Sequence, residues 1–147
     1  MRIPADLQVG FEEIDGQHGA ILAALEEAQR ALPARDLPAL RAALAGLGDL
    51  LVAHFAAEEA FMAESLYPDR TRHKAAHDLF MQDLAQLVRE VEGGGLGEQV
   101  SQWVNTRLPE WMKFHIRVND LPLGRFLAAR RFRPRPGSAA GAKPRVS

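Results

Sequence analysis

The sequence predicts an all-α protein, an up-down-up-down four-helix bundle, and three observations favour this class. Apolar residues recur three or four positions apart in four separate stretches of the chain. No stretch alternates apolar and polar residues with the period of two that a half-buried strand requires. The connections between the stretches are short, which is typical of antiparallel neighbours in a bundle.

The first two predicted helices have recognisable ends. Asp15 stands where the N-cap of the first helix belongs, and Pro33 ends that helix. Asp36 is the predicted N-cap of the second helix, with Pro38 in the first turn, and "SLYPD" (65–69) ends it. The apolar positions are Ile14, Ile21, Leu22, Leu25 and Leu32 in the first helix, and Leu40, Leu44, Leu47, Leu51, Phe55 and Met62 in the second.

The third predicted helix ends at "GGG" (93–95), and "LPLG" (121–124) is expected to close the fourth. Pro109 lies inside the fourth helix and is expected to kink it, because proline lacks an N–H and clashes with the preceding turn. The apolar positions are Phe80, Leu84, Leu87 and Val91 in the third helix, and Val100, Trp103, Val104, Leu108, Trp111, Ile116 and Val118 in the fourth.

Length and composition limit the class of protein. At 147 residues the chain fits one domain with a sizeable core. It contains no cysteine, which excludes disulfides, thiolate metal ligands and cysteine nucleophiles. The N-terminal residues lack the apolar run of a signal peptide, and no uncharged apolar run approaches the roughly 20 residues of a membrane span. We therefore expect a cytoplasmic protein without a membrane span.

Basic residues are concentrated at the C-terminus. Residues 130–147 carry six of the 18 Lys and Arg residues and none of the 19 Asp and Glu residues. This segment is rich in Pro, Gly and Ala, so we predict a bundle over 1–129 and a disordered basic tail over 130–147. The alternative is an arm for an acidic surface or nucleic acid. Six charges with a single aromatic residue among them are a weak signal, so no nucleic-acid partner is expected.

The five histidines follow a pattern over the four predicted helices. Residues four apart on a helix point the same way, with Cβ atoms about 5–6 Å apart. His54 and Glu58 on the second helix have this spacing, as do His73 and His77 on the third. Each pair falls on the apolar stripe of its helix, so these polar side chains are expected to point into the core.

A metal centre explains these inward polar residues better than ordinary core packing does. A single histidine on an apolar face is usually a hydrogen-bonded core residue, but here all five, including His18 and His115, take inward positions. A buried glutamate such as Glu58 is costly unless it is paired or bound to a cation. Asp120 follows His115 by five residues, about 1.4 turns on and slightly off its face, and can join the centre if the helix end relaxes there.

The donor inventory indicates two metals and one open position. Two octahedral metals that share three bridging groups have six terminal positions, and five imidazoles fill all but one. Nitrogen and oxygen donors without sulfur suit iron, with manganese or cobalt as alternatives, whereas zinc usually takes four ligands. An open position on a metal is the property of a site that binds a small ligand.

The chain resembles the hemerythrin family, in its bacterial single-domain form, over roughly residues 9 to 128. The resemblance rests on "VGFEEIDGQH", "HFAAEEAFM", "YPDRTRHKAAHDLF" and "WMKFHIRVNDLPLGRFL". Together these segments give H, HxxxE, HxxxH and HxxxxD on successive helices. The chain departs from the family in lacking a tryptophan in its N-terminal arm, in Pro109 and in its basic tail.

The resemblance implies a cofactor of two iron ions (Fe2+/Fe3+) with an oxo or hydroxo bridge. His73, His77 and His115 would hold one iron, and His18 and His54 the other. Glu58 and Asp120 would bridge the pair, and dioxygen would bind at the open position of the second iron. Helical spacing from His115 and the neighbouring aromatic residues suggest a dry apolar cap over that iron, formed by Phe55, Trp111 and Val118.

The predicted function is reversible dioxygen binding by a non-enzymatic carrier, storage or delivery protein, with an oxygen-consuming protein as a possible recipient. The alternatives are a di-iron enzyme of the peroxidase or nitric oxide reductase type and an oxygen or redox sensor. Di-iron enzymes of the ferritin-like class use more carboxylates, which stabilise high-valent iron. Five neutral imidazoles to two carboxylates favour binding.

Overall fold

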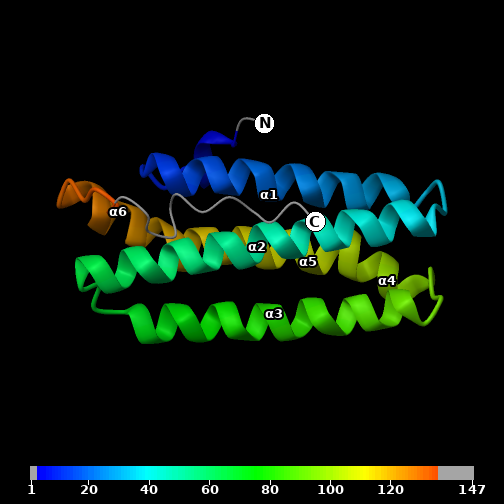
Figure 1. The fold of residues 1–147 in the computed structure, drawn as a ribbon. Coiled ribbons are helices and arrows are strands. Elements are labelled where there is room, and N and C mark those ends of the chain that lie inside the picture. Colours follow the sequence, from blue (N-terminus) through cyan, green and yellow to red (C-terminus); the bar gives the residue numbers. More distant parts are fainter. Residues whose placement is uncertain (1–2, 136–147) are drawn as a thin grey trace.

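The computed structural model describes residues 3–135, which form four antiparallel helical rods and no strand (Figure 1). This arrangement confirms the predicted fold class. The first three rods are α1 (Glu12–Ala31), α2 (Leu37–Ser65) and α3 (Arg70–Glu92). The fourth rod is built from α4 (Glu98–Gln102), η2 (Trp103–Arg107), α5 (Leu108–His115), η3 (Ile116–Asp120) and α6 (Leu121–Ala129). A short 3₁₀ turn, η1 (Ala5–Leu7), precedes α1.

Two aspartates that were predicted as N-caps have different roles. The Asp36 carboxylate accepts a hydrogen bond from the Ala39 N–H at 3.0 Å, which confirms it as the N-cap of α2. The prediction for Asp15 is wrong, because α1 begins earlier in the chain. The Asp15 carboxylate instead accepts from the N–H groups of Val9 and Gly10, at 2.8 and 3.2 Å. It therefore ties the N-terminal arm, residues 3–11, to α1.

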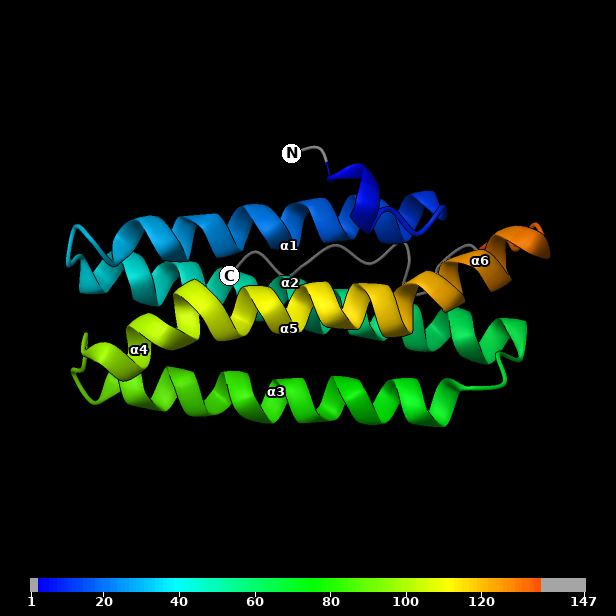
Figure 2. The same cartoon turned by 180° about the vertical axis from the view of Figure 1, so that it is seen from behind.

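The fourth rod contains two π-helical turns, η2 and η3, each followed by a proline. In η2 the Leu108 N–H donates to the Trp103 carbonyl, five residues back rather than four. Pro109 follows. Proline has no N–H to donate, and the wider turn accommodates this missing hydrogen bond. Figure 2 shows the rod changing direction between α4 and α5, which agrees with the predicted kink at Pro109.

The sequence suggested that "LPLG" ends the fourth rod, but the rod continues through this segment. In η3 the Leu121 N–H donates to the Ile116 carbonyl, again five residues back. Pro122 then occupies the first turn of α6, where its missing N–H costs nothing, and the helix continues to Ala129. The proline therefore marks an irregular turn inside the rod.

The N-terminal arm packs closely against α6 at Gly124. A Cβ atom added there would lie 2.5 Å from the Val9 carbonyl oxygen and 2.7 Å from the Val9 Cγ2 atom. Val9 and Leu7 are both buried in this position. The absence of a side chain at Gly124 is what lets the arm cover this end of the bundle.

The start of the predicted tail also packs on the bundle. Arg131 adopts a left-handed conformation, φ 50°, just after α6. The Phe132 N–H returns to the Leu127 carbonyl at 2.9 Å, which closes a Schellman motif. The Phe132 ring then lies 5.7 Å from the ring of Phe61. Residues 130–135 therefore differ from the predicted free tail, because Phe132 has apolar surface to bury. Residues 136–147 of that prediction lie outside the described residues.

Among the described helices, α2 is the one that is long and apolar enough to cross a membrane by length and composition. Core helices of bundles meet the same criterion. Its apolar side chains Leu40, Leu44, Leu47 and Leu51 are buried between the helices. The apolarity of α2 thus reflects its packing against the other helices and does not indicate a membrane span.

Candidate metal centre

Seven ionisable side chains from all four helical rods meet in the core. They form the largest buried polar group among residues 3–135, each at most 2% exposed. These residues are His18, His54, Glu58, His73, His77, His115 and Asp120. All seven were singled out in the sequence, and the structure brings all of them together.

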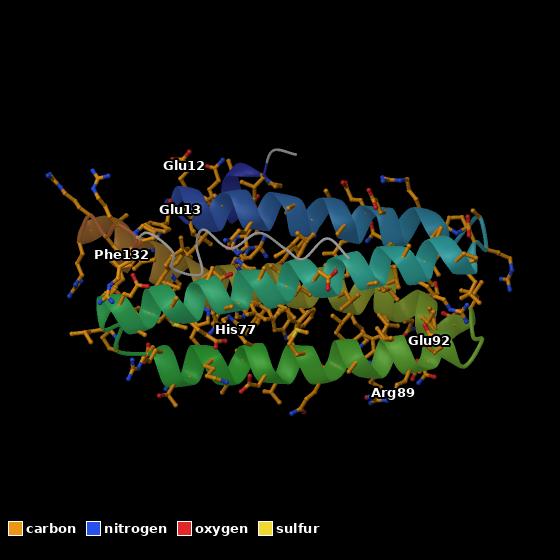
Figure 3. The ribbon with its side chains drawn as sticks, in the orientation of Figure 1. Glu12, Glu13, His77, Arg89, Glu92 and Phe132 are labelled. Atoms are coloured by element: carbon orange, nitrogen blue, oxygen red, sulfur yellow. The ribbon has the colours of Figure 1, made fainter. Side chains whose placement is uncertain are left out.

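Regular helical turns position the residues from α2 and α3. His54 and Glu58 lie one turn apart on α2, and their side chains approach to 3.5 Å. His73 and His77 lie one turn apart on α3, with ring centroids 4.6 Å apart. Figure 3 shows His77 between the helices, whereas Arg89 on the same helix points away from the bundle.

The π turn η3 brings Asp120 onto the same face as His115. The backbone hydrogen bond spans five residues there, so Asp120 lies about one turn after His115 and on the same side of the rod. The His115 Nε2 and Asp120 Oδ1 atoms are 3.1 Å apart. The sequence predicted that Asp120 would lie off this face unless the helix ended. The structure achieves the same approach with an irregular turn inside a continuing helix.

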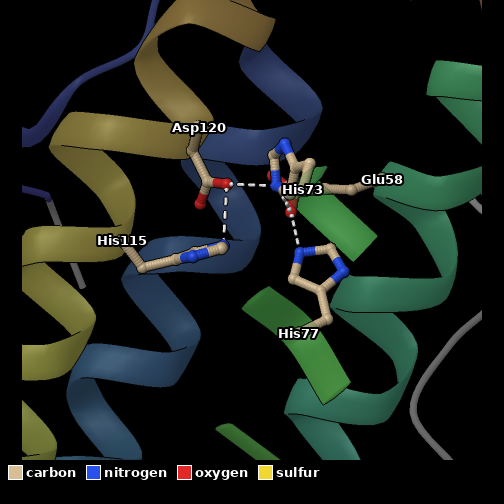
Figure 4. A group of neighbouring side chains, drawn as sticks. All are labelled: Glu58, His73, His77, His115 and Asp120. Carbon is tan, nitrogen blue, oxygen red and sulfur yellow. Dashed lines mark hydrogen bonds and ion pairs between the residues drawn. The ribbon is translucent and has the colours of Figure 1, made fainter. Parts of the chain in front are cut away.

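The seven side chains divide into two overlapping sets of donor atoms, each within 4.8 Å of one another. The first set, drawn in Figure 4, is Glu58, His73, His77, His115 and Asp120. The second set is His18, His54, Glu58 and Asp120. The two carboxylates belong to both sets, so one set has three histidines and the other has two.

The histidine Nε2 atoms point at the shared carboxylates. In the three-histidine set, the Glu58 Oε1 atom lies 3.2 Å from His73 and 3.0 Å from His77. In the two-histidine set, the Asp120 Oδ2 atom lies 2.7 Å from His18 and 3.7 Å from His54. Glu58 therefore meets two histidines of α3, and Asp120 lies between histidines of α1 and α2.

The pKa values of the two carboxylates are shifted in opposite directions. Burial raises the pKa of Glu58 well above its usual value, and the charge of Asp120 acts in the same direction. Burial alone would also raise the pKa of Asp120. The charge of His115, whose Nε2 atom is 3.1 Å away, together with the hydrogen bond of His18, instead holds that pKa well below its usual value. Without metal, the negative charge of the centre is concentrated on Asp120.

The pKa values of three histidines are shifted, two of them downward and one upward. Burial lowers the pKa of His54 to about 4. Burial and the charge of His73 lower the pKa of His77 to about 2. Burial opposes protonation of His73 too, but the close contacts of its Nε2 atom with Asp120 at 3.0 Å and Glu58 at 3.2 Å raise its pKa to about 9. Without metal, His73 thus holds a proton at neutral pH that metal binding would release, because a ligating imidazole must be neutral.

Donor atoms without partners show that the centre fits a metal. Seven atoms of its residues are buried without a hydrogen bond among residues 3–135. Three are the Nδ1 atoms of His18, His73 and His115, and the other four are His54 Nε2, Glu58 Oε2, His115 Nε2 and Asp120 Oδ1. Buried polar atoms normally find a partner. A cation would satisfy all four, and a nitrogen and oxygen donor set without sulfur suits iron.

Two further residues, which the sequence reasoning missed, hold the outer nitrogens of ligand histidines. The Gln17 Oε1 atom lies 2.6 Å from His54 Nδ1, and the Glu59 Oε2 atom lies 3.0 Å from His77 Nδ1. Each acceptor is next to a proposed ligand in the sequence. Successive side chains on a helix are rotated by about 100°, so a residue next to a ligand points toward a neighbouring helix. The position of Gln17 and Glu59 next to a ligand was therefore the signal in the sequence that could have identified them.

Aromatic rings border the centre, and one predicted wall is absent. The Phe55 ring stacks on His77 at 3.9 Å, and the Trp111 ring stacks on His115 at 4.7 Å. Val118 is 50% exposed, so the prediction that it lines the pocket is wrong. The π turn is the cause, because it keeps His115 and Asp120 inward while Arg117 and Val118, which lie between them, are exposed.

Comparisons with known proteins agree with this geometry. Residues 9–126 match the family described as "Hemerythrin HHE cation binding domain". A bacteriohemerythrin of Stenotrophomonas maltophilia is 31% identical over 78% of this chain and 73% of its own length. A bacteriohemerythrin of Pseudomonas aeruginosa is 29% identical over the same shares. A hemerythrin-like protein of Naegleria gruberi is 33% identical over 77% of this chain and 82% of its own. The chain therefore belongs to the hemerythrin family, whose buried histidine and carboxylate cluster holds non-heme iron.

Proposed function

We propose that the protein binds dioxygen reversibly at a pair of iron ions. The observation that carries this proposal is the division of the seven donors into a three-histidine set and a two-histidine set that share both carboxylates. Two six-coordinate irons joined by Glu58, Asp120 and a bridging oxygen would leave one position open. That position would be on the iron held by His18 and His54.

In this proposal the residues have distinct roles. His73, His77 and His115 would complete the coordination of one iron and leave it no position for a further ligand. Glu58 and Asp120 would hold both irons. The iron pair, when bound, supplies the two electrons that dioxygen requires. The residues of the chain keep the metals in place and exclude water.

The donor set favours binding over oxidative catalysis. Of the seven donors, five are imidazoles and two are carboxylates. Ferritin-like di-iron enzymes use more carboxylate ligands, whose negative charge stabilises more oxidised iron. A centre supported mainly by neutral ligands has less tendency to cleave the oxygen–oxygen bond. We therefore infer a non-enzymatic role.

Apolar side chains next to the two-histidine set would keep the open position dry. Ile21 lies three residues after His18, and Leu51 lies three residues before His54, so each shares a face with its histidine. Both are at most 1% exposed. Phe55 extends this wall, with its ring 5.7 Å from that of His54. Trp111 supports the three-histidine side. Bound oxygen that meets no water is expected to leave as dioxygen.

The biological role that fits a reversible binder is carriage, storage or delivery of oxygen to an oxygen-consuming protein. An iron count and a gas titration test the binding. Protein reconstituted with Fe2+ without oxygen is expected to hold two irons, to change its absorbance when oxygen is admitted, and to return to the original spectrum under argon. Oxygen consumption that continues beyond one equivalent per iron pair would support the enzyme alternative instead.

His54→Ala provides the matched control for this experiment. It removes one of the two histidines of the open iron, so iron content and the oxygen-dependent spectrum should fall together. Val118→Ala changes an exposed residue of η3 and should leave both unchanged. A wild-type protein that binds two irons but shows no oxygen-dependent spectrum would contradict the proposal.

A further inference from the structure

The two halves of the metal centre differ in what holds their histidines from outside. In the three-histidine set, His77 Nδ1 donates to the Glu59 carboxylate at 3.0 Å. In the two-histidine set, His54 Nδ1 donates to the Gln17 side-chain carbonyl at 2.6 Å. The Nδ1 atoms of the other three histidines have no partner among residues 3–135. One half therefore has an anionic acceptor and the other a neutral one.

This difference affects the electron density at each iron. A carboxylate that accepts the outer N–H of a ligating imidazole makes the imidazole a stronger donor, and outer partners of this kind typically change metal affinity 10- to 100-fold. A stronger donor stabilises Fe3+ more than Fe2+. A neutral amide makes a weaker hydrogen bond than a carboxylate does. The iron beside Glu59 should consequently retain the ferric state more strongly.

Glu59 lies in a partly exposed groove beside the cluster, where the charge of Lys74 opposes the burial that raises the pKa of Glu59. Its side chain is 33% exposed and lines a groove between α2 and α3 with a volume of about 440 Å³. Lys74 and Asp78 line the same groove and pair with each other at 3.0 Å. Figure 4 shows one ring nitrogen of His77 toward Glu58 and the other turned away from the cluster. Glu59 meets that outer nitrogen.

We propose that Glu59 is a positioning residue that sets the order in which the two irons change oxidation state. The inference rests on the proposed function, because it requires two bound irons. When both irons are ferric, the first electron from a one-electron reductant converts the iron of the two-histidine set to Fe2+. The second electron reduces the iron beside His77. The iron with the open position is thus the first to become ferrous again.

Charge-swapping variants separate this role from simple packing. Glu59→Gln keeps an oxygen acceptor and the shape of the side chain but removes the charge. Gln17→Glu adds a charge behind His54, at a half-buried position. The double variant exchanges the two acceptors. Asp78→Asn is the matched control, because it removes a carboxylate next to His77 in the sequence that does not hold its ring.

The experiment is a potentiometric titration of the ferric protein with a one-electron reductant. The mixed-valence state is characterised by electron paramagnetic resonance and Mössbauer spectroscopy. Wild-type protein is expected to show two separate one-electron steps. Glu59→Gln should raise the potential of the second step by about 59 mV for a tenfold loss of ferric preference. Gln17→Glu should lower the first step, and the double variant should show an altered mixed-valence spectrum. Asp78→Asn should leave both steps near wild type.

Several outcomes would overturn the inference. Unshifted potentials in Glu59→Gln, or an equal shift in Asp78→Asn, would mean that Glu59 does not set the order. If Glu59→Gln loses its iron, Gln17→Glu still decides, because an unchanged first step in that variant overturns the inference too. A wild-type iron count below two would refute the proposed function itself, and that count is measured before any titration.

Discussion

Removing the metal should strongly destabilise the protein, and the structure gives a magnitude. Four donor atoms of the centre that make no hydrogen bond among residues 3–135 are His54 Nε2, Glu58 Oε2, His115 Nε2 and Asp120 Oδ1. An unsatisfied buried polar group costs about 1–3 kcal/mol, so the four together cost roughly 4–12 kcal/mol when no cation is bound. Native domains are stable by only about 5–15 kcal/mol in total. Water that enters the empty centre would relieve part of the cost, so the lower end is the safer expectation.

The assay compares thermal unfolding of iron-loaded protein with protein from which iron has been removed by a chelator and dialysis. A loss of about 4 kcal/mol corresponds to a fall in Tm of at least about 12 °C, at roughly 3 °C per kcal/mol for a chain of this size. Adding Fe2+ back without oxygen should restore the original Tm. A fall of less than about 3 °C, with iron removal verified, would refute the reasoning and mean that the empty centre satisfies its polar groups in another way.

Three other predictions test the packing, the electrostatics and the pocket. Gly124→Ala should destabilise the protein by about 1–3 kcal/mol, because the new Cβ would lie 2.5 Å from a backbone oxygen of the N-terminal arm. Gly46→Ala, with nothing within 4 Å, should instead stabilise α2 by up to about 1 kcal/mol, and urea unfolding compares the two signs. Metal-free protein should lose at least about 3 kcal/mol as the pH falls from 6.5 to about 4, because unfolded His54 takes up its proton near pH 6.5 but folded His54 does so only near pH 4. The lowered pKa of His77 adds a loss in the same direction, and a flat profile in denaturant titrations at several pH values would contradict this. Leu51→Ala should speed autoxidation by opening a cavity beside His54, whereas exposed Val118→Ala should match wild type in timed spectra.

The parts of the centre that could be predicted from sequence are those that depend on a regular helix. His54 with Glu58, and His73 with His77, share a face because four residues make nearly one turn. That relation is local, so no knowledge of the neighbouring helices was needed. The N-cap at Asp36 is local in the same way, because its carboxylate meets an N–H three residues on.

The parts that could not be predicted depend on contacts between distant segments. Asp15 looks like an N-cap in the sequence, but its carboxylate accepts a hydrogen bond from Val9 of the N-terminal arm. The arm can lie there because Gly124, against which Val9 packs, has no side chain. Phe132 stands among basic residues that suggest a free tail, yet its ring finds Phe61 at 5.7 Å. Gln17 contacts a ligand on another helix, across 37 positions of sequence. Periodicity within one helix contains no information about such partners.

The π turn η3 explains why helical periodicity failed for Val118 and was ambiguous for Asp120. A strict α-helix puts the residue three after His115 on the inner face and the residue five after it to the side. The observed turn reverses both placements, with Val118 50% exposed and Asp120 fully buried. Pro122, just beyond the turn, is compatible with this geometry because it has no N–H to be satisfied. A carboxylate five residues after an inward histidine, with a proline two residues further on, thus indicates a π turn within a continuing helix. Had the helix ended there, α6 would not continue from Asp120, and Gly124 would not be positioned for the arm that covers this end of the bundle.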